Sequence, residues 1–110
     1  MKIVLPTCPS DNHLYGMRGK TRFMYKEGKE WKENAQMIAK LKWKKKPTTK
    51  PLTMTINFYL KRDRDVHGSG KLIADSLEGI VYVNDKQIKK MIFEKFIDKD
   101  NPRIEIEIII

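Results

Sequence analysis

Apolar residues occupy every second position between residues 52 and 60, where the chain reads LTMTINFYL. Side chains of a strand point alternately to its two faces, so this pattern predicts a strand with one buried face. The closing segment 103–110, RIEIEIII, alternates in the same way before it ends in an apolar run. Shorter segments predict further strands at 2–5 (KIVL), at 21–25 (TRFMY) and over 87–97.

Two segments have helical periodicity instead. Between residues 26 and 41, apolar side chains recur at steps of three and four, at Trp31, Ala35, Ile38 and Leu41. Residues 69–78 predict a second helix, which Gly79 closes. The predicted order is strand, loop, strand, helix, strand, helix, strand, strand. We therefore expect one domain over residues 1–110, of the α+β class, with a small mixed sheet and two main helices packed on one face of it.

The charge balance of the chain indicates what kind of partner to expect. The chain carries 23 Lys and Arg against 14 Asp and Glu, a formal charge of +9. This excess favours nucleic acid first and an anionic membrane second, although a lysine-rich solvated surface has the same composition. Contacts to DNA phosphates release counterions, so binding should weaken with salt. The candidate DNA-binding residues are Arg18, Lys20, Arg22, Lys42, Lys44, Lys45, Lys46 and Lys50.

Composition also excludes some classes of protein. The single cysteine, Cys8, cannot form an internal disulfide, and we interpret it as a packing residue or a bystander. No apolar run approaches the roughly 20 residues of a membrane span. The apolar segment at the N-terminus is too short for a signal peptide. These features predict a cytoplasmic protein with no membrane partner.

The central segment 64–79, RDVHGSGKLIADSLEG, gathers acidic groups, a histidine and a lysine at helical spacing. Positions three or four apart share one face of a helix, and the polar stripe that results consists of His67, Lys71, Asp75 and Glu78. The apolar residues of the same segment face the other way, and these are Leu72, Ile73 and Leu77. An ordinary amphipathic helix with one solvated Lys–Asp pair has the same pattern, so spacing alone does not separate the two interpretations.

Acidic residues at three places favour a metal site. Asp65 follows the most regular strand, Asp75 lies on the predicted helix, and Asp85 lies on a turn after a short apolar segment. A strand end, a helix start and a turn can bring these carboxylates and His67 together. Oxygen-rich groups suit Mg²⁺, which promotes phosphoryl transfer. Lys71 would then stabilise negative charge in the transition state.

Several other features have two interpretations each. Gly68 and Gly70 either adopt positive φ in a tight turn or let a phosphate approach the helix N-terminus. Tyr15 and Trp43 stand near the basic clusters, where they either stack on exposed bases or pack within the protein. The final run IEIEIII is either apolar surface for a dimer or a core strand.

These central residues resemble the RusA-type Holliday-junction resolvases, small dimeric endonucleases common in prophages. The residues that correspond to the family pattern R-D-x-D-N-x-x-K-x-x-x-D-A-L-x-G-V-x-x-D-D-x-Q-I are Arg64, Asp65, Lys71, Asp75, Leu77, Gly79, Asp85, Gln87 and Ile88, the last three after one extra residue. The family's P-P-S-x-N-x-x-Y is similar to residues 8–15, CPSDNHLY, and the segment 25–31 is similar as well. The resemblance covers nearly the whole chain.

The resemblance implies a RusA-like fold and Mg²⁺-dependent cleavage of four-way DNA junctions, with Mn²⁺ as a second candidate cofactor. A homodimer would nick two strands of like polarity during DNA recombination and repair, and no small-molecule substrate is implied. Asp65 and Asp85 would be metal ligands, and Lys71 would be the catalytic lysine. The implied catalytic set is Asp65, His67, Lys71, Asp75 and Asp85.

The chain departs from the family pattern at three positions. His67 replaces the second aspartate, Gly68 replaces the asparagine after it, and Asn84 replaces the first aspartate of the Asp-Asp pair. Imidazole suits Zn²⁺ or Mn²⁺ better than Mg²⁺, so His67 either changes the metal preference, acts as a base or weakens activity.

A gapped register would pair Asp63 with Asp65 as the D-x-D element and leave two extra residues before Lys71. We prefer the ungapped register, because Lys71 and Asp75 share a helix whose phase fixes their distance from the preceding strand. The predicted metal ligands are Asp65, His67 and Asp85, with Asp63 and Asp75 as alternates.

Two competing functions share the basic surface. A non-catalytic nucleic-acid-binding protein would use the same cations and keep the acidic residues for structure. A degenerate resolvase would bind branched DNA and cut it slowly, and His67 keeps this alternative open.

Overall fold

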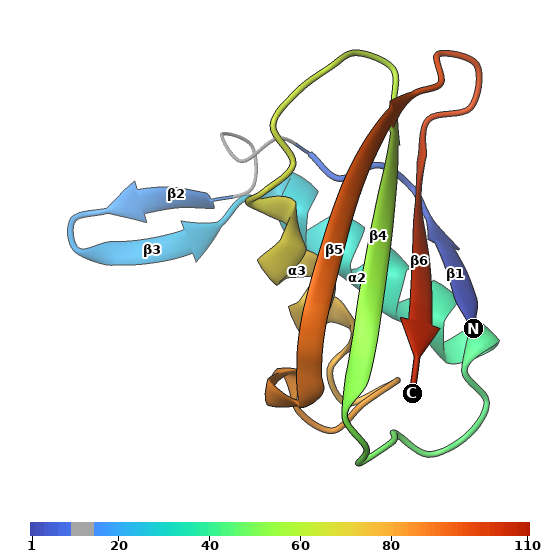
Figure 1. The fold of residues 1–110 in the computed structure, drawn as a ribbon. Coiled ribbons are helices and arrows are strands. Elements are labelled where there is room, and N and C mark those ends of the chain that lie inside the picture. The colour runs from blue at the N-terminus through green and yellow to red at the C-terminus, as the bar shows by residue number, and fades with distance from the viewer. Residues whose placement is uncertain (10–14) are drawn as a thin grey trace.

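The computed structural model describes residues 1–9 and 15–110, the latter without the side chains of residues 15–18, 22 and 23. The described strands are β1 (Lys2–Leu5), β2 (Tyr15–Arg18), β3 (Thr21–Met24), β4 (Leu52–Leu60), β5 (Ile88–Ile97) and β6 (Arg103–Ile109). The helices are α2 (Lys26–Lys42), α3 (Ser69–Leu77) and the short 3-10 helix η1 (Asp85–Gln87). The predicted α+β fold, with a small mixed sheet and two main helices, is confirmed (Figure 1).

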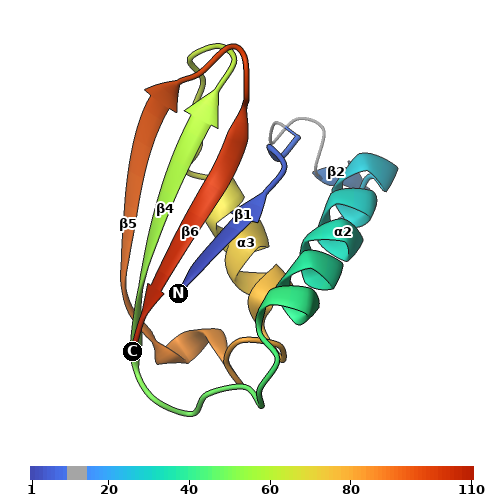
Figure 2. The ribbon, with the colours of Figure 1, turned by 90° about the vertical axis from the view of Figure 1, so that its right-hand side faces the viewer.

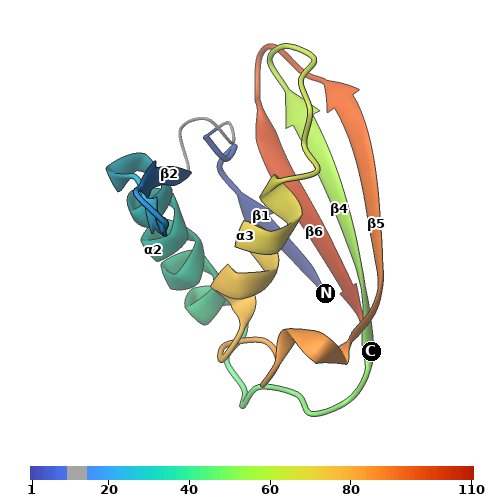
Figure 3. The same cartoon turned by 90° about the vertical axis from the view of Figure 1, so that its left-hand side faces the viewer.

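The main sheet has the strand order β1-β6-β4-β5, and β2 and β3 form a separate hairpin. Strand β4 pairs antiparallel with β6 and parallel with β5, while β1 pairs antiparallel with β6. Helices α2 and α3 lie on the same side of this sheet and leave its other face open (Figures 2 and 3). The core therefore lies between one sheet face and the two helices, as the sequence predicted.

The two alternating strands are the centre of this core. In β4 every second side chain is buried and those between are half-buried. In β6, Ile104, Ile106 and Ile108 are buried, whereas Ile109 and Ile110 are more than half exposed. The closing run is thus a core strand as far as Ile108, and its last two residues are exposed apolar surface.

Helix α2 buries Trp31, Ala35 and Ala39, which follow one another at steps of four residues. Leu41, which we predicted on this face, is 69% exposed. It lies two residues beyond Ala39 and so about 200° around the helix axis, on the solvent side. Among the described residues, no helix combines the length and the apolar character that a membrane crossing needs.

Cys8 and Trp43, whose roles the sequence left open, are both core residues. Each is at most 6% exposed, and the indole Nε1 of Trp43 donates a hydrogen bond to the carbonyl of Lys46. Stacking of Trp43 on DNA bases is therefore wrong, because its faces are covered by the protein. The side chain of Tyr15 lies outside the described residues.

The connection from β4 to β5 crosses the helical face of the sheet through α3 and η1. Gly79 follows α3 with φ +82°, the conformation that the sequence predicted for the residue closing this helix. The buried Tyr82 then donates a hydrogen bond from its hydroxyl to the carbonyl of Ala74 in α3. The segment before β5 is thereby fastened to the helix.

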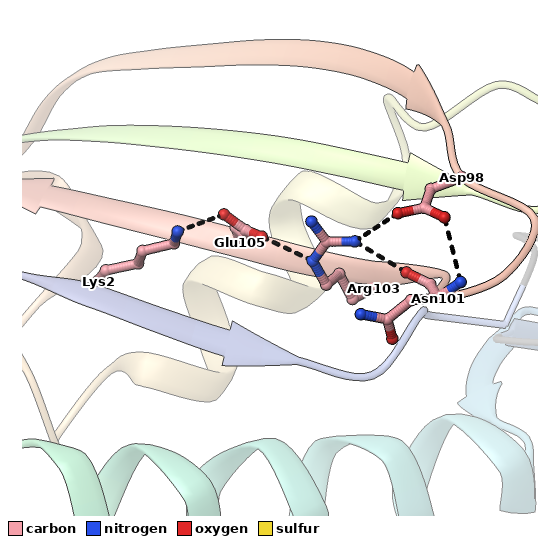
Figure 4. Close-up of polar contacts among 5 residues, drawn as sticks. All are labelled: Lys2, Asp98, Asn101, Arg103 and Glu105. Atoms are coloured by element: carbon pink, nitrogen blue, oxygen red, sulfur yellow. Dashed lines mark hydrogen bonds and ion pairs between the residues drawn. The ribbon is translucent and has the colours of Figure 1, made fainter.

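The open face of the sheet carries a chain of ion pairs (Figure 4). Arg103 contacts Glu105 at 2.6 Å and Asp98 at 2.8 Å, and Lys2 contacts Glu105 at 2.6 Å. Hydrogen bonds from Arg103 lower the pKa of Asp98, and those from Lys2 and then Arg103 lower the pKa of Glu105. The guanidinium of Arg103 also lies 3.9 Å from the centre of the Tyr59 ring.

We predict that Arg103→Leu makes the protein less sensitive to acid. A carboxyl whose pKa is lowered by folding stabilises the native state above its unfolded pKa, and this contribution is lost as the pH falls through the folded value. The free energy of unfolding of the parent should therefore fall as the pH drops below about 4, the ordinary carboxyl range. Urea titrations at a series of pH values should show a shallower fall for the variant. Parallel curves for the two proteins would contradict the prediction.

We predict that Tyr82→Phe lowers the free energy of unfolding by about 1–2 kcal/mol, because the buried carbonyl of Ala74 loses a donor. Urea denaturation measures this change. Tyr59→Phe is the matched control, since the hydroxyl of Tyr59 makes no hydrogen bond within the described residues and its removal should be nearly neutral. Equal effects of the two substitutions would show that the Tyr82 hydroxyl contributes nothing to stability.

Candidate functional site

The polar stripe predicted for the central helix lies on the solvent-facing side of α3. The ammonium group of Lys71 is 3.4 Å from a carboxylate oxygen of Asp75, as their spacing of four residues predicted. On the opposite side, Leu72, Ile73 and Leu77 are fully buried. Burial of these three apolar side chains therefore turns the polar stripe of α3 toward solvent.

Three carboxylates gather where α3 ends. Asp75 lies in the last turn of the helix, Glu78 follows it, and Asp85 begins η1. A carboxylate oxygen from each lies within 4.8 Å of those from the other two. We call Asp75, Glu78 and Asp85 the acidic group. All three are partly exposed, so the group is open to solvent on one side.

The local backbone explains why Asp85 meets the helix. The chain turns back at Gly79, and Tyr82 forms an isolated β-bridge with Glu78. The side chain of Asn84 then accepts a hydrogen bond from the backbone of Lys86, and the side chain of Gln87 accepts one from the backbone of Asn84. This reciprocal cap fixes the start of η1, and with it Asp85.

Tyr82 lies beneath the acidic group. Burial raises the pKa of its phenol, and the negative charges of Asp85, Glu78 and Asp75 raise it further. The hydroxyl is therefore neutral and remains a hydrogen-bond donor to α3. The buried ring of Tyr82 therefore lies below the three carboxylates and adds no negative charge to the acidic group.

The acidic group fits a divalent cation by its donor atoms. All of its ligand atoms are carboxylate oxygens, the donors that Mg²⁺ and Mn²⁺ prefer, and soft sulfur or imidazole donors are not among them. Mg²⁺ commonly takes only one or two protein carboxylates and keeps several waters, which the solvent-open side of the group permits.

Asp65 and His67 form a separate pair at the other end of α3. One carboxylate oxygen of Asp65 is 2.6 Å from Nδ1 of His67 and also accepts the backbone N–H of His67 at 3.0 Å. These hydrogen bonds, the backbone one first, lower the pKa of Asp65. Both side chains are largely exposed, so Asp65 is an ionised carboxylate that orients the imidazole.

A groove of about 440 Å³ lies between α3 and the first half of β5. Lys71 lines it from the helix, His67 from the loop before the helix, and Asp85 near the start of β5. The side of the groove formed by β5 carries Ile88, Lys89, Lys90, Met91 and Phe93. The groove therefore combines apolar side chains with three lysines and has one carboxylate, Asp85.

The structure divides the residues that we expected to converge. Asp75 and Asp85 lie together, whereas Asp65 and His67 lie outside the acidic group, before the other end of α3. The alternate ligand Asp63 is paired with Lys95 at 2.9 Å, near the far end of β5. The assignment of Asp65 and His67 as metal ligands therefore stays a prediction.

Sequence reasoning missed three residues of the site. Glu78 belonged to the predicted stripe but not to the predicted ligands, although it stands three residues after Asp75. Lys89 and Lys90 follow the motif directly and were read only as part of a strand. Their position in the groove results from the packing of β5 beside α3, which no local sequence pattern predicts.

Neither interpretation of the two glycines holds. Gly68 has φ −67°, and among the described residues only Gly19 and Gly79 have positive φ. The backbone N–H groups of Ser69 and Gly70 already donate to carbonyls of the preceding loop, so they are not open to a phosphate. A Cβ at Gly70 would lie 2.5 Å from Cζ of Phe93, so this glycine serves close packing of α3 on β5.

Five of the predicted DNA-binding lysines lie at the end of α2 and in the loop after it, which contacts the segment that carries Asp85. The loop that follows α2 is joined to the segment before η1 by backbone hydrogen bonds between Thr48 and both Val81 and Val83. The side-chain amide of Gln87 also donates to the carbonyls of Thr48 and Lys50, at 2.8 and 3.0 Å. The exposed lysines of this region, which we call the lysine loop, are Lys42, Lys44, Lys45, Lys46 and Lys50.

The other predicted DNA contacts lie on the β2–β3 hairpin. Lys20 is exposed in its turn, and the side chains of Arg18 and Arg22 lie outside the described ones. Figure 1 shows the hairpin projecting away from the sheet.

Comparison with known proteins identifies the family of the chain. A search of curated proteins found no match. The family described as Endodeoxyribonuclease RusA matches residues 5–109, which include both helices and the whole main sheet apart from the first three residues of β1. The resemblance found in the central motif is confirmed over nearly the whole chain. The chain therefore belongs to the RusA endodeoxyribonuclease family.

Proposed function

We propose that this chain resolves four-way DNA junctions by divalent-metal-dependent cleavage of phosphodiester bonds. The family supports nuclease activity and points to Holliday junctions as the substrate. The single observation that carries the metal dependence is the acidic group, in which carboxylate oxygens of Asp75, Glu78 and Asp85 come within 4.8 Å of one another. A bound Mg²⁺ or Mn²⁺ ion would supply an activated water and neutralise charge on the phosphate.

The chain's own side chains would bind and orient the phosphate. Lys71 is held by Asp75 at the edge of the groove and carries a positive charge toward it, where it would stabilise the dianionic transition state. Asp65 occupies Nδ1 of His67, so the other ring nitrogen, Nε2, is left to bind a phosphate oxygen or to transfer a proton.

DNA would reach this site across the lysine loop. The loop is hydrogen-bonded to the segment that carries Asp85, so phosphates bound by its exposed lysines would be delivered beside the acidic group. We further propose a homodimer, because symmetric nicks in two strands need two active sites. The exposed Ile109 and Ile110 offer apolar surface for such an interface.

A second candidate is a protein that binds branched DNA and cuts it slowly or not at all. The observation that favours it is the substitution of His67 for the family's second aspartate, together with the position of the Asp65–His67 pair outside the acidic group. Cleavage assays on a synthetic junction with Mg²⁺ and with Mn²⁺ separate the two. Junction binding without cutting in either metal would establish the second function.

We predict that Asp85→Asn reduces junction cleavage by at least roughly a hundredfold, the scale of losing one electrostatic group from an active site. Binding to the uncut junction should stay near that of the parent, since a lost negative charge removes no phosphate contact. Single-turnover cleavage and fluorescence anisotropy measure the two quantities. The control is Asp100→Asn, an exposed carboxylate in the turn after β5, which should cut at the parent rate. Cleavage by the Asp85 variant at the parent rate would exclude Asp85 as a ligand.

A further inference from the structure

Strand β5 contains one extra residue near its start. Leu52 of β4 lies opposite Ile88, but the next residue, Thr53, lies opposite Lys90, so Lys89 has no partner on β4. An insertion of this kind is a β-bulge, which bends the strand and redirects a side chain. Bulges are over-represented next to active sites, and this one lies beside Asp85, which lines the same groove as Lys89.

Lys89 lies on the side of β5 that faces α3. Met91 and Phe93 pack against the core, and Phe93 lies against Gly70 of α3. Side chains of a strand alternate between its two faces, so Lys89 shares the helix-facing side with Met91 and Phe93, whereas Lys90 faces the other way. Lys89 lines the groove that Lys71 lines from the helix, and it adds a cation to this wall of the groove.

These charges are not neutralised by the protein. Lys71 is balanced by Asp75, whereas neither Lys89 nor Lys90 forms an ion pair within the described residues. Both are exposed, and Asp85 lines the same groove. Unbalanced cations on the wall of an open trough favour an anionic, extended ligand, and a nucleic-acid strand presents a phosphate at each nucleotide.

We propose that Lys89, which lines the groove together with Asp85, binds a backbone phosphate of the DNA strand that runs past Asp85. This inference rests on the proposed function, whose metal site lies at the same groove. Lys89 differs from the lysine loop because it stands on a strand of the main sheet, and a side chain on a strand is held more precisely than one on a loop. Its role is to set the position of the strand along the groove.

The first test measures salt dependence of binding to a four-way junction and to a plain duplex, in the absence of divalent metal. Lys89→Gln should weaken binding by roughly five- to tenfold at about 0.1 M salt and reduce the slope of log K against log salt by about 0.9, the value of one lost phosphate contact. Lys89→Arg keeps the charge and should keep both quantities. Lys99→Gln, an exposed lysine in the turn after β5, is the control and should match the parent.

The second test locates the phosphate. Junction strands carrying one neutral methylphosphonate at successive backbone positions are bound by the parent and by Lys89→Gln. We expect both proteins to lose affinity at the phosphates that the lysine loop binds. At one further phosphate near the cut bond, only the parent should lose affinity, because in the variant that contact is already absent. Equal losses at every position in both proteins would overturn the proposal.

The outcomes separate this inference from the proposed function. A parent that binds and cuts junctions, together with a Lys89→Gln slope equal to that of Lys99→Gln, overturns the role of Lys89 alone. A parent that binds duplex and junction equally and cuts neither overturns the proposed function. If the reduced slope and the position-specific loss persist in that case, the phosphate contact of Lys89 still stands. Unchanged thermal melting of the variants shows that each effect is on binding.

Discussion

The parallel pairing of β4 with β5 is the constraint on which the rest of the structure depends. Parallel neighbours cannot be joined by a tight turn, so the chain must return along the sheet before the second strand starts. Here residues 61–87 make that return through α3 and η1. Every candidate catalytic residue lies in this connection. Its length also separates Asp65, at its beginning, from Asp85, at its end.

Burial of apolar side chains fixes the site, whereas the functional groups contribute little to stability. Leu72, Leu77 and Tyr82 have no exposed surface, and burying side chains of this size stabilises a fold by roughly 1.5–3 kcal/mol each. The Lys71–Asp75 pair is largely solvated, and exposed pairs of this kind contribute at most about 1 kcal/mol. Charged residues of the site can therefore be substituted at little cost in stability, because the buried side chains hold the groove in place.

The sequence predicted the elements well because each has a local cause. Alternation marked β4 and β6, and the motif spacing placed Lys71 and Asp75 on one face of α3. The sequence wrongly placed Leu41 on the buried side of α2 and left the role of Trp43 undecided, because the buried side of a helix depends on what packs against it. From the sequence we expected the acidic residues to converge. Only the fold shows which of them lie at the same end of the connection between β4 and β5. The bulge at Lys89 depends on register with β4, and no pattern in β5 alone reveals it.

The central claim is that the acidic group at the end of α3 holds the divalent ion. Anomalous diffraction from crystals soaked in Mn²⁺, at a concentration that supports cleavage, tests this directly. We expect a manganese peak bound by carboxylates of Asp75, Glu78 and Asp85. A peak between Asp65 and His67 instead, with none at the end of α3, would contradict it.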